Sequence, residues 1–188
     1  KDIEEAIGAA QSAGGTQLAL LHCVSGYPAP ARDYNLRTLP EMAKRFVLPV
    51  GLSDHTLDIT TAIASVALGA CIIEKHFTLD RSGGGPDDSF SLEPKDLKKL
   101  CVGAKDAWEA MGSVSYGCKP SEEPNLKFRR SLYFVEDLKE GQVIKSSSIR
   151  SVRPGYGLPP KYMDDLVGRK VLKDVSFGTP TSFEVIGQ

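Results

Sequence analysis

Residues 51–80 read GLSDHTLDITTAIASVALGACIIEKHFTLD, and this stretch decides the fold class. It holds two short apolar runs that pass into polar residues, with a helical pattern of small residues between them over residues 59–70. Strand, helix and strand in this order predict a βαβ unit with parallel strands. His55 and His76 then lie near the ends of two neighbouring strands.

The preceding residues repeat this pattern. DIEEAIGAAQSAGG, residues 2–15, predicts a helix with a Gly-Gly stop, LALLHCVS, residues 18–25, a buried strand, and residues 35–46 a further helix. The alternation predicts an α/β fold with a parallel sheet covered by helices, either doubly wound or a (β/α)₈ barrel. In both architectures ligands bind at the carboxyl ends of the strands.

The alternation of helices and strands stops after residue 80. DRSGGGPDDSFSLEP, residues 80–94, predicts a loop that precedes a long helix, and no GK[ST] follows its glycines, so it is not a P-loop. Residues 113–124 predict a linker between a first domain, 1–112, and a small β-rich domain, 125–188. The β-like runs of that second domain cover residues 131–138, 142–154, 169–175 and 180–186.

Composition narrows the class of partner. The 23 Lys and Arg residues balance 24 Asp and Glu residues, so the net charge of −1 favours a small-molecule ligand over nucleic acid or an acidic membrane surface. No apolar run approaches the roughly 18 to 20 residues of a membrane span. The four cysteines form no CxxC pair and no dense disulfide framework, which favours the cytoplasm.

The two histidines predict a shared metal site. Their separation, 76 − 55 = 21 residues, is about one βα repeat, so adjacent parallel strands bring them side by side. Two protein nitrogens leave coordination positions open, which argues against closed structural zinc and for a divalent ion that polarises a substrate carbonyl. Glu74 and Asp87 add carboxylates nearby. The alternative is that each histidine is a hydrogen-bonded structural residue.

Two further residues have both a functional and a structural interpretation. Asp87 lies in the Gly-rich loop, where a carboxylate can hydrogen-bond sugar hydroxyls or order water, although such a loop can also be a flexible connector. Arg153 stands beside the Pro-Gly bend of SVRPGYGLPP, and is either a ligand-binding guanidinium or a solvated side chain.

Seven segments carry a resemblance to a known family: LLHCVSGYPAP, GLSDHT, ALGA, EKHFTLD, GPDDSFSLEP, FRRSLY and RPGYG. Their order and spacing resemble the sialic acid synthase family over essentially the whole chain. The resemblance implies the last three strands of a (β/α)₈ TIM barrel, followed by an antifreeze-like SAF domain of the β-clip type. By that comparison the chain is the C-terminal part of a longer enzyme, with an unpaired strand edge, and we expect it to be inactive alone.

The resemblance also implies a reaction and a set of residues. Family members condense phosphoenolpyruvate with an open-chain N-acetylated amino sugar and release phosphate, with a divalent ion that is manganese or, alternatively, magnesium or cobalt. They act as domain-swapped homodimers, in which an arginine reaches the partner's sugar. The matching positions are His55 and His76 for the metal, Glu74 and Asp87 as catalytic acidic groups, Ser25, Tyr27 and Ser53 for phosphoenolpyruvate, and Arg153 for the sugar.

More than one branch of the family and more than one class of activity agree with the sequence. GGGPDDSFSLEP resembles the pseudaminic acid synthase branch most, with the N-acetylneuraminate and legionaminate branches as alternatives. Ser25 stands where the neuraminate branch commonly has Asn. Two other classes are a sugar-binding remnant without chemistry and a metal-dependent aldolase or hydrolase on a similar barrel. Retention of both histidines with Glu74 argues against the remnant.

Overall fold

The computed structural model describes residues 1–186 and divides the chain into two compact units, the first spanning Lys1–Val114 and the second beginning at Ser115. Each unit has its own cluster of buried apolar side chains. Gly187 and Gln188, which end the predicted second domain, lie outside the described residues.

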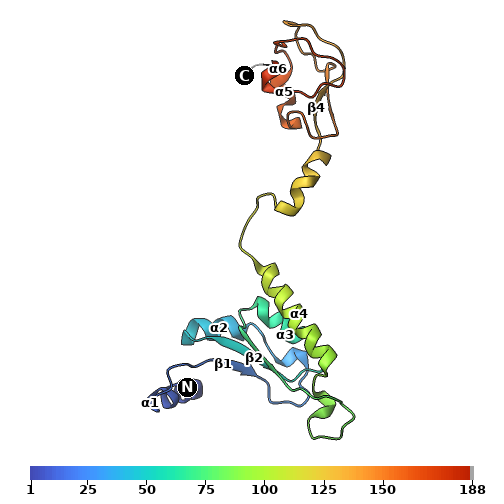
Figure 1. Ribbon diagram of the computed structural model, residues 1–188. Helices are drawn as coiled ribbons and strands as arrows, with labels where there is room; N and C mark the ends of the chain where they lie inside the picture. The colour runs from blue at the N-terminus through green and yellow to red at the C-terminus, as the bar shows by residue number, and fades with distance from the viewer. Residues whose placement is uncertain (187–188) are drawn as a thin grey trace. The chain divides into compact units, whose positions relative to one another are not determined.

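The first unit is an α/β structure with a parallel sheet, as predicted. The strand order is β1-β2-β3, and both pairings are parallel. Figure 1 shows these strands with their helices, coloured from blue to yellow-green. The elements are α1 (Asp2–Ser12), β1 (Leu20–Cys23), η1 (Ala31–Asp33), α2 (Thr38–Phe46), β2 (Val50–Asp54), α3 (Thr60–Ala67), β3 (Ile72–Lys75), η2 (Asp88–Phe90) and α4 (Pro94–Met111).

Strand β2 is the centre of this sheet, and all five of its residues are buried. Gly51 allows its neighbours to approach closely, since a Cβ at this position would lie 2.5 Å from the carbonyl oxygen of Ile72 and 2.6 Å from Cδ2 of Leu21. Strands β1 and β3 each pair with β2 on one side, and among residues 1–186 neither has a second strand neighbour. The exposed edge agrees with the expectation from the sequence.

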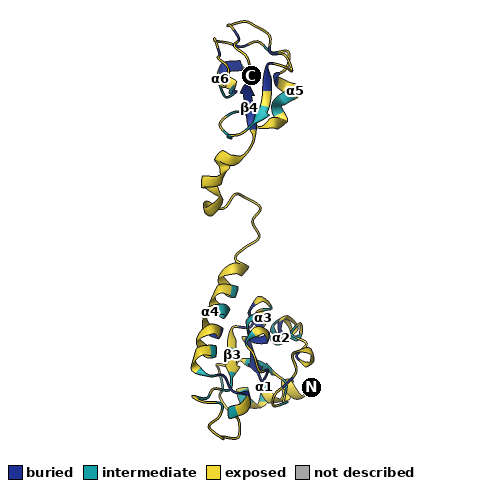
Figure 2. Cartoon of the chain, turned by 90° about the vertical axis from the view of Figure 1, so that its right-hand side faces the viewer, coloured by how far each residue is buried: buried dark blue, intermediate teal, exposed yellow. Residues whose placement is uncertain are grey.

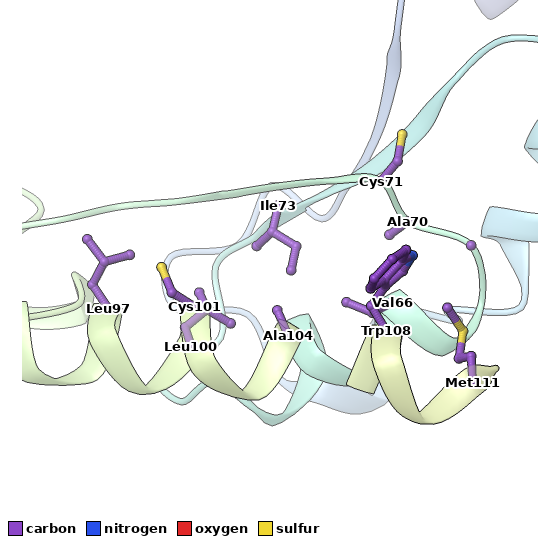
Figure 3. Close-up of a pocket in the computed structure, with 11 residues that line it drawn as sticks. Val66, Ala70, Cys71, Ile73, Leu97, Leu100, Cys101, Ala104, Trp108 and Met111 are labelled. Atoms are coloured by element: carbon purple, nitrogen blue, oxygen red, sulfur yellow. The ribbon is translucent and has the colours of Figure 1, made fainter. Parts of the chain in front are cut away.

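Helices α3 and α4 pack against each other beside the sheet (Figure 1). A Cβ on Gly103 would lie 2.6 Å from Cδ1 of Ile63, so the glycine lets the two helices come close. Together with the start of β3 they line an apolar pocket of about 570 Å³ (Figure 3). Trp108 is 66% exposed and lies on this pocket, which none of the predicted site residues lines.

The second unit is built around a short antiparallel pair of strands. Its elements are η3 (Pro120–Phe128), β4 (Ser131–Phe134), β5 (Ile149–Val152), η4 (Pro160–Tyr162), α5 (Met163–Leu166) and α6 (Phe183–Ile186). Isolated bridges at Leu138–Val175 and Val143–Lys170 continue the β-like pairing. All residues of η3, which includes the end of the predicted linker, are exposed (Figure 2).

The prediction of a β-like run over residues 180–186 was wrong for most of its length. Pro180 makes one bridge to Tyr133, but the chain then turns into helix α6. The amides of Val185 and Ile186 both bond the carbonyl of Ser182, and both side chains are buried in the core of the unit. In a strand, adjacent side chains point to opposite faces, so Val185 and Ile186 could not both face the core. The helix allows both side chains to be buried, which explains its formation here.

No helix within residues 1–186 has the length and apolarity needed to cross a lipid bilayer.

Tyr34 ties the core of the first unit to the end of β2. Its side chain is fully buried, its hydroxyl accepts a hydrogen bond from the amide of His55 at 2.6 Å, and it donates to the carbonyl oxygen of Ser53 at 3.4 Å. Burial raises the pKa of Tyr34, so the hydroxyl keeps the proton that it donates.

Replacing Tyr34 by Phe leaves the buried amide of His55 without its partner. Because an unsatisfied buried donor costs about 1 to 3 kcal/mol, Tyr34→Phe should lower the free energy of unfolding by that amount in a denaturant titration. Tyr116→Phe is the control, since Tyr116 is 99% exposed. Equal stabilities of the two variants would contradict the role assigned to this hydroxyl.

Candidate active site

The register of the sheet brings the predicted residues to one edge. Ser53 on β2 is the Cα partner of both Cys23 on β1 and Glu74 on β3. The hydroxyl of Ser53 donates a 2.7 Å hydrogen bond to Oε1 of Glu74. The carboxylate of Glu74 is therefore held toward β2, at the edge where both histidines follow their strands.

His55 and His76 lie side by side, with ring centroids 5.2 Å apart. Nδ1 of His55 lies 2.8 Å from the carbonyl oxygen of Val24, so this nitrogen carries the proton and donates it. Nδ1 of His76 lies 3.4 Å from Oδ2 of Asp87. Each ring thus has its Nδ1 engaged, which leaves the two Nε2 atoms as the available ligand nitrogens.

These imidazoles fit a divalent metal ion. Histidine ligands commonly donate their second ring nitrogen to a carbonyl or a carboxylate, which fixes the tautomer and the ring orientation, and both arrangements are present here. Among residues 1–186 no group of three or more His, Cys, Asp and Glu side chains is clustered for metal binding. The protein groups that could hold an ion here are thus the two imidazole nitrogens, and an ion bound by them would keep further coordination positions for a substrate or water.

An aromatic surface borders the histidines. The Tyr27 ring lies 4.3 Å from that of His55 and 5.8 Å from that of His76, and the Phe90 ring lies 5.2 Å from that of His76. Tyr27 is 54% exposed, whereas Phe90 is buried. Phe90 was not singled out from the sequence, because an apolar residue in a Gly-rich loop carries no chemical signal of its own.

The loop that carries Asp87 is internally bonded. Oδ2 of Asp88 accepts the amide of Gly85 at 2.8 Å, and a Cβ on Gly83 or Gly85 would lie 2.9 or 2.8 Å from this oxygen. Nε of Arg81 donates to the carbonyl oxygen of Ser91 at 2.7 Å. The glycines let the loop fold around Asp88, so the loop is more than a connector and presents Asp87 toward His76.

Ser25 and Arg153 are the remaining predicted site residues. Ser25 is exposed beyond β1 and has no hydrogen-bond partner among the described residues. Arg153 belongs to the second unit, where it lines a pocket of about 570 Å³ with Arg150 and Phe177. Within residues 1–186 no carboxylate pairs with Arg150 or Arg153.

Asp54 and Lys75 directly precede the two histidines in the chain, and the sequence analysis assigned them no role. They form a buried ion pair with a 2.9 Å separation between Oδ2 and Nζ. The sequence does contain a pattern that indicates this ion pair, because the two opposite charges have the same 21-residue spacing as the histidines. Tyr34, by contrast, lies in an irregular segment and gave no signal.

Comparisons with known proteins match both units. Residues 1–116 match the NeuB family, and residues 129–182 match the SAF domain. The chain is 38% identical over 92% of its length to N,N'-diacetyllegionaminic acid synthase of Campylobacter jejuni, and 38% identical over 86% to a pseudaminic acid synthase of that species, covering 53% and 47% of those proteins. It thus spans about half the length of these curated relatives.

A solved structure gives the same result for the fold. The crystal structure of the spore coat polysaccharide biosynthesis protein SpsE from Bacillus subtilis superposes on the whole chain with a TM-score of 0.55 and 31% identity, over 58% of its own length. The combination of an α/β unit with a second, SAF-type unit is therefore shared with proteins of this group.

Removal of one imidazole should weaken metal binding. In the protein that contains this chain, His76→Ala should lower the affinity for Mn²⁺ about 10-fold or more in calorimetry, because a single remaining nitrogen leaves a weak site. Lys105→Ala is the control, since Lys105 is an exposed residue of α4 that pairs with Glu109. Unchanged Mn²⁺ affinity in His76→Ala would refute the two-histidine site.

Proposed function

This chain belongs to the NeuB family, and we propose that the protein containing it condenses phosphoenolpyruvate with an open-chain N-acetylated amino sugar. The products are inorganic phosphate and a nine-carbon 2-keto acid of the sialic type. The observation that carries the proposal is the pair of imidazoles with free Nε2 atoms, adjacent to the hydrogen-bonded Ser53 and Glu74.

The reaction forms one carbon–carbon bond. Carbon 3 of phosphoenolpyruvate attacks the aldehyde carbon, whose oxygen takes up a proton and becomes a hydroxyl. Water adds to the resulting cationic carbon 2 and loses a proton. The new hydroxyl then gives up its own proton and becomes the keto oxygen, while the bond from carbon 2 to the phosphate oxygen breaks and the released phosphate takes up a proton. A divalent ion held by His55 and His76, which we take to be manganese, with magnesium or cobalt as alternatives, would supply polarisation of the aldehyde.

The carboxylates have distinct proposed roles. Oε1 of Glu74 accepts the Ser53 hydroxyl, while Oε2 has no protein donor among the described residues and is free to accept a proton from water or a sugar hydroxyl. Asp87 pairs with Nδ1 of His76 and so orients that ring, and its half-exposed carboxylate can also bond the acceptor. Tyr27 offers a flat, partly exposed ring beside both imidazoles for phosphoenolpyruvate.

The proposed acceptor is the diacetamido-trideoxy-altrose of pseudaminic acid synthesis. Its support is the GGGPDDSFSLEP loop, which presents Asp87 beside the histidines. Equal identity to legionaminic and pseudaminic acid synthases does not separate these acceptors.

We assign the protein to the cytoplasm, since its four cysteines are free thiols.

Phosphate release tests both the reaction and the acceptor. Release from phosphoenolpyruvate should require an amino sugar, and the specificity constant should be roughly ten- to a hundred-fold higher for the diacetamido sugar than for N-acetylmannosamine, because one unpaired buried polar group costs about 1 to 3 kcal/mol. Equal constants would contradict the pseudaminic assignment. Release without any sugar would favour a hydrolase, and no release would favour a binding remnant.

We further propose that the second unit completes the site of a partner chain in a domain-swapped homodimer. Arg153 and Arg150 lack carboxylate partners within residues 1–186 and share a pocket with Phe177. A guanidinium presented in this way can bind the oxygens of a sugar acceptor bidentately.

Mixed dimers test this arrangement. Arg153→Ala should raise the sugar's Michaelis constant or lower turnover while leaving phosphoenolpyruvate binding nearly intact. A heterodimer of His76→Ala and Arg153→Ala chains should regain one working site, because one chain keeps both histidines and receives a native Arg153 from its partner. If a verified heterodimer stays inactive, the arginine acts within its own chain or has no role in substrate binding.

A further inference from the structure

A buried ion pair joins β2 to β3 directly before the two histidines. Oδ2 of Asp54 lies 2.9 Å from Nζ of Lys75, and these side chains are 0% and 3% exposed. The two residues are Cα partners in the parallel register, and this is the last pair of that ladder. Each precedes one histidine in the chain, so the ion pair is the final cross-strand link before the imidazoles.

The hydrogen bonds of this pair continue into the turn after β2. Oδ1 of Asp54 accepts the amide of Thr56 at 2.9 Å, and Oδ2 accepts its hydroxyl at 3.1 Å. The ammonium group of Lys75 also donates to the carbonyl oxygen of Thr56. The pair therefore holds residues on both sides of His55, and its two side chains are too deeply buried to touch a substrate.

Stability alone does not account for these charges. Taking two charged groups out of water is costly, and buried ion pairs can often be replaced by apolar groups of similar volume without loss of stability. An apolar replacement would fill the same space, but it would not bond the backbone of the turn at Thr56. What the charges supply is a defined geometry at the strand ends.

We infer that Asp54 and Lys75 form a positioning pair that sets the separation and orientation of His55 and His76 for a divalent ion. The inference rests on the proposed function, since it assumes that the two imidazoles are ligands. Neither residue is catalytic. Lys75 acts on His55 through Thr56 and on His76 through the backbone, and Asp54 fixes the far end of Lys75.

The test distinguishes an effect of the ion pair on the geometry of the two histidines from an effect on the stability of the protein. In the protein that contains this chain, the double variant Asp54→Asn/Lys75→Met removes both charges and the hydrogen bond from Lys75 to the carbonyl oxygen of Thr56, and it nearly conserves volume. We expect its affinity for Mn²⁺ alone, measured by calorimetry, to fall about 10- to 100-fold. The denaturant midpoint should stay the same or rise. Lys139→Met, which removes an exposed ion pair with Asp174, is the control and should leave Mn²⁺ affinity unchanged.

The single variant Lys75→Met is a second measurement, with the orphaned Asp54 expected to lower stability as well as Mn²⁺ affinity. If the double variant binds Mn²⁺ within twofold of the wild type while His76→Ala loses binding, the positioning role is wrong and the metal site stands. If His76→Ala also binds normally, both the metal site and the positioning role are wrong. If the double variant fails to fold, the pair is a stability element and the inference is overturned.

Discussion

The parallel pairing of β2 with its two neighbours is the constraint on which the site depends. In a parallel ladder the carboxyl ends of adjacent strands meet at one edge, and the register here aligns Ser53 with Glu74 and Asp54 with Lys75. The serine–glutamate hydrogen bond and the buried ion pair both follow from this register. A slip of one residue would turn every one of these side chains to the opposite face of the sheet.

Next to this edge the buried polar groups have hydrogen-bond partners within the first unit. Tyr34 bonds the amide of His55, Val24 bonds its ring, and Asp54 bonds the turn at Thr56. Among the described residues no buried side-chain nitrogen or oxygen lacks a partner. Because an unsatisfied group in such a place would be costly, this network favours one arrangement of the loop, and the Nε2 atoms of both histidines stay available to a ligand.

The second unit contributes a different kind of surface. Its short β4–β5 pair carries Arg150 and leads into Arg153, and both guanidinium groups line a pocket without a neutralising carboxylate within residues 1–186. Guanidinium groups in such a pocket can donate hydrogen bonds to an anionic or oxygen-rich ligand.

Sequence by itself determined the alternation of helices and strands, the parallel sheet and the pairing of His55 with His76, because periodicity and a constant repeat spacing are local properties of the chain. It did not determine helix α6, where burial of Val185 and Ile186 overrode a β-like pattern. Nor did it reveal Phe90 beside His76, or the hydroxyl of Tyr34 on the amide of His55. Those contacts join segments far apart in the chain, and only the packing of the folded unit decides which side chains meet.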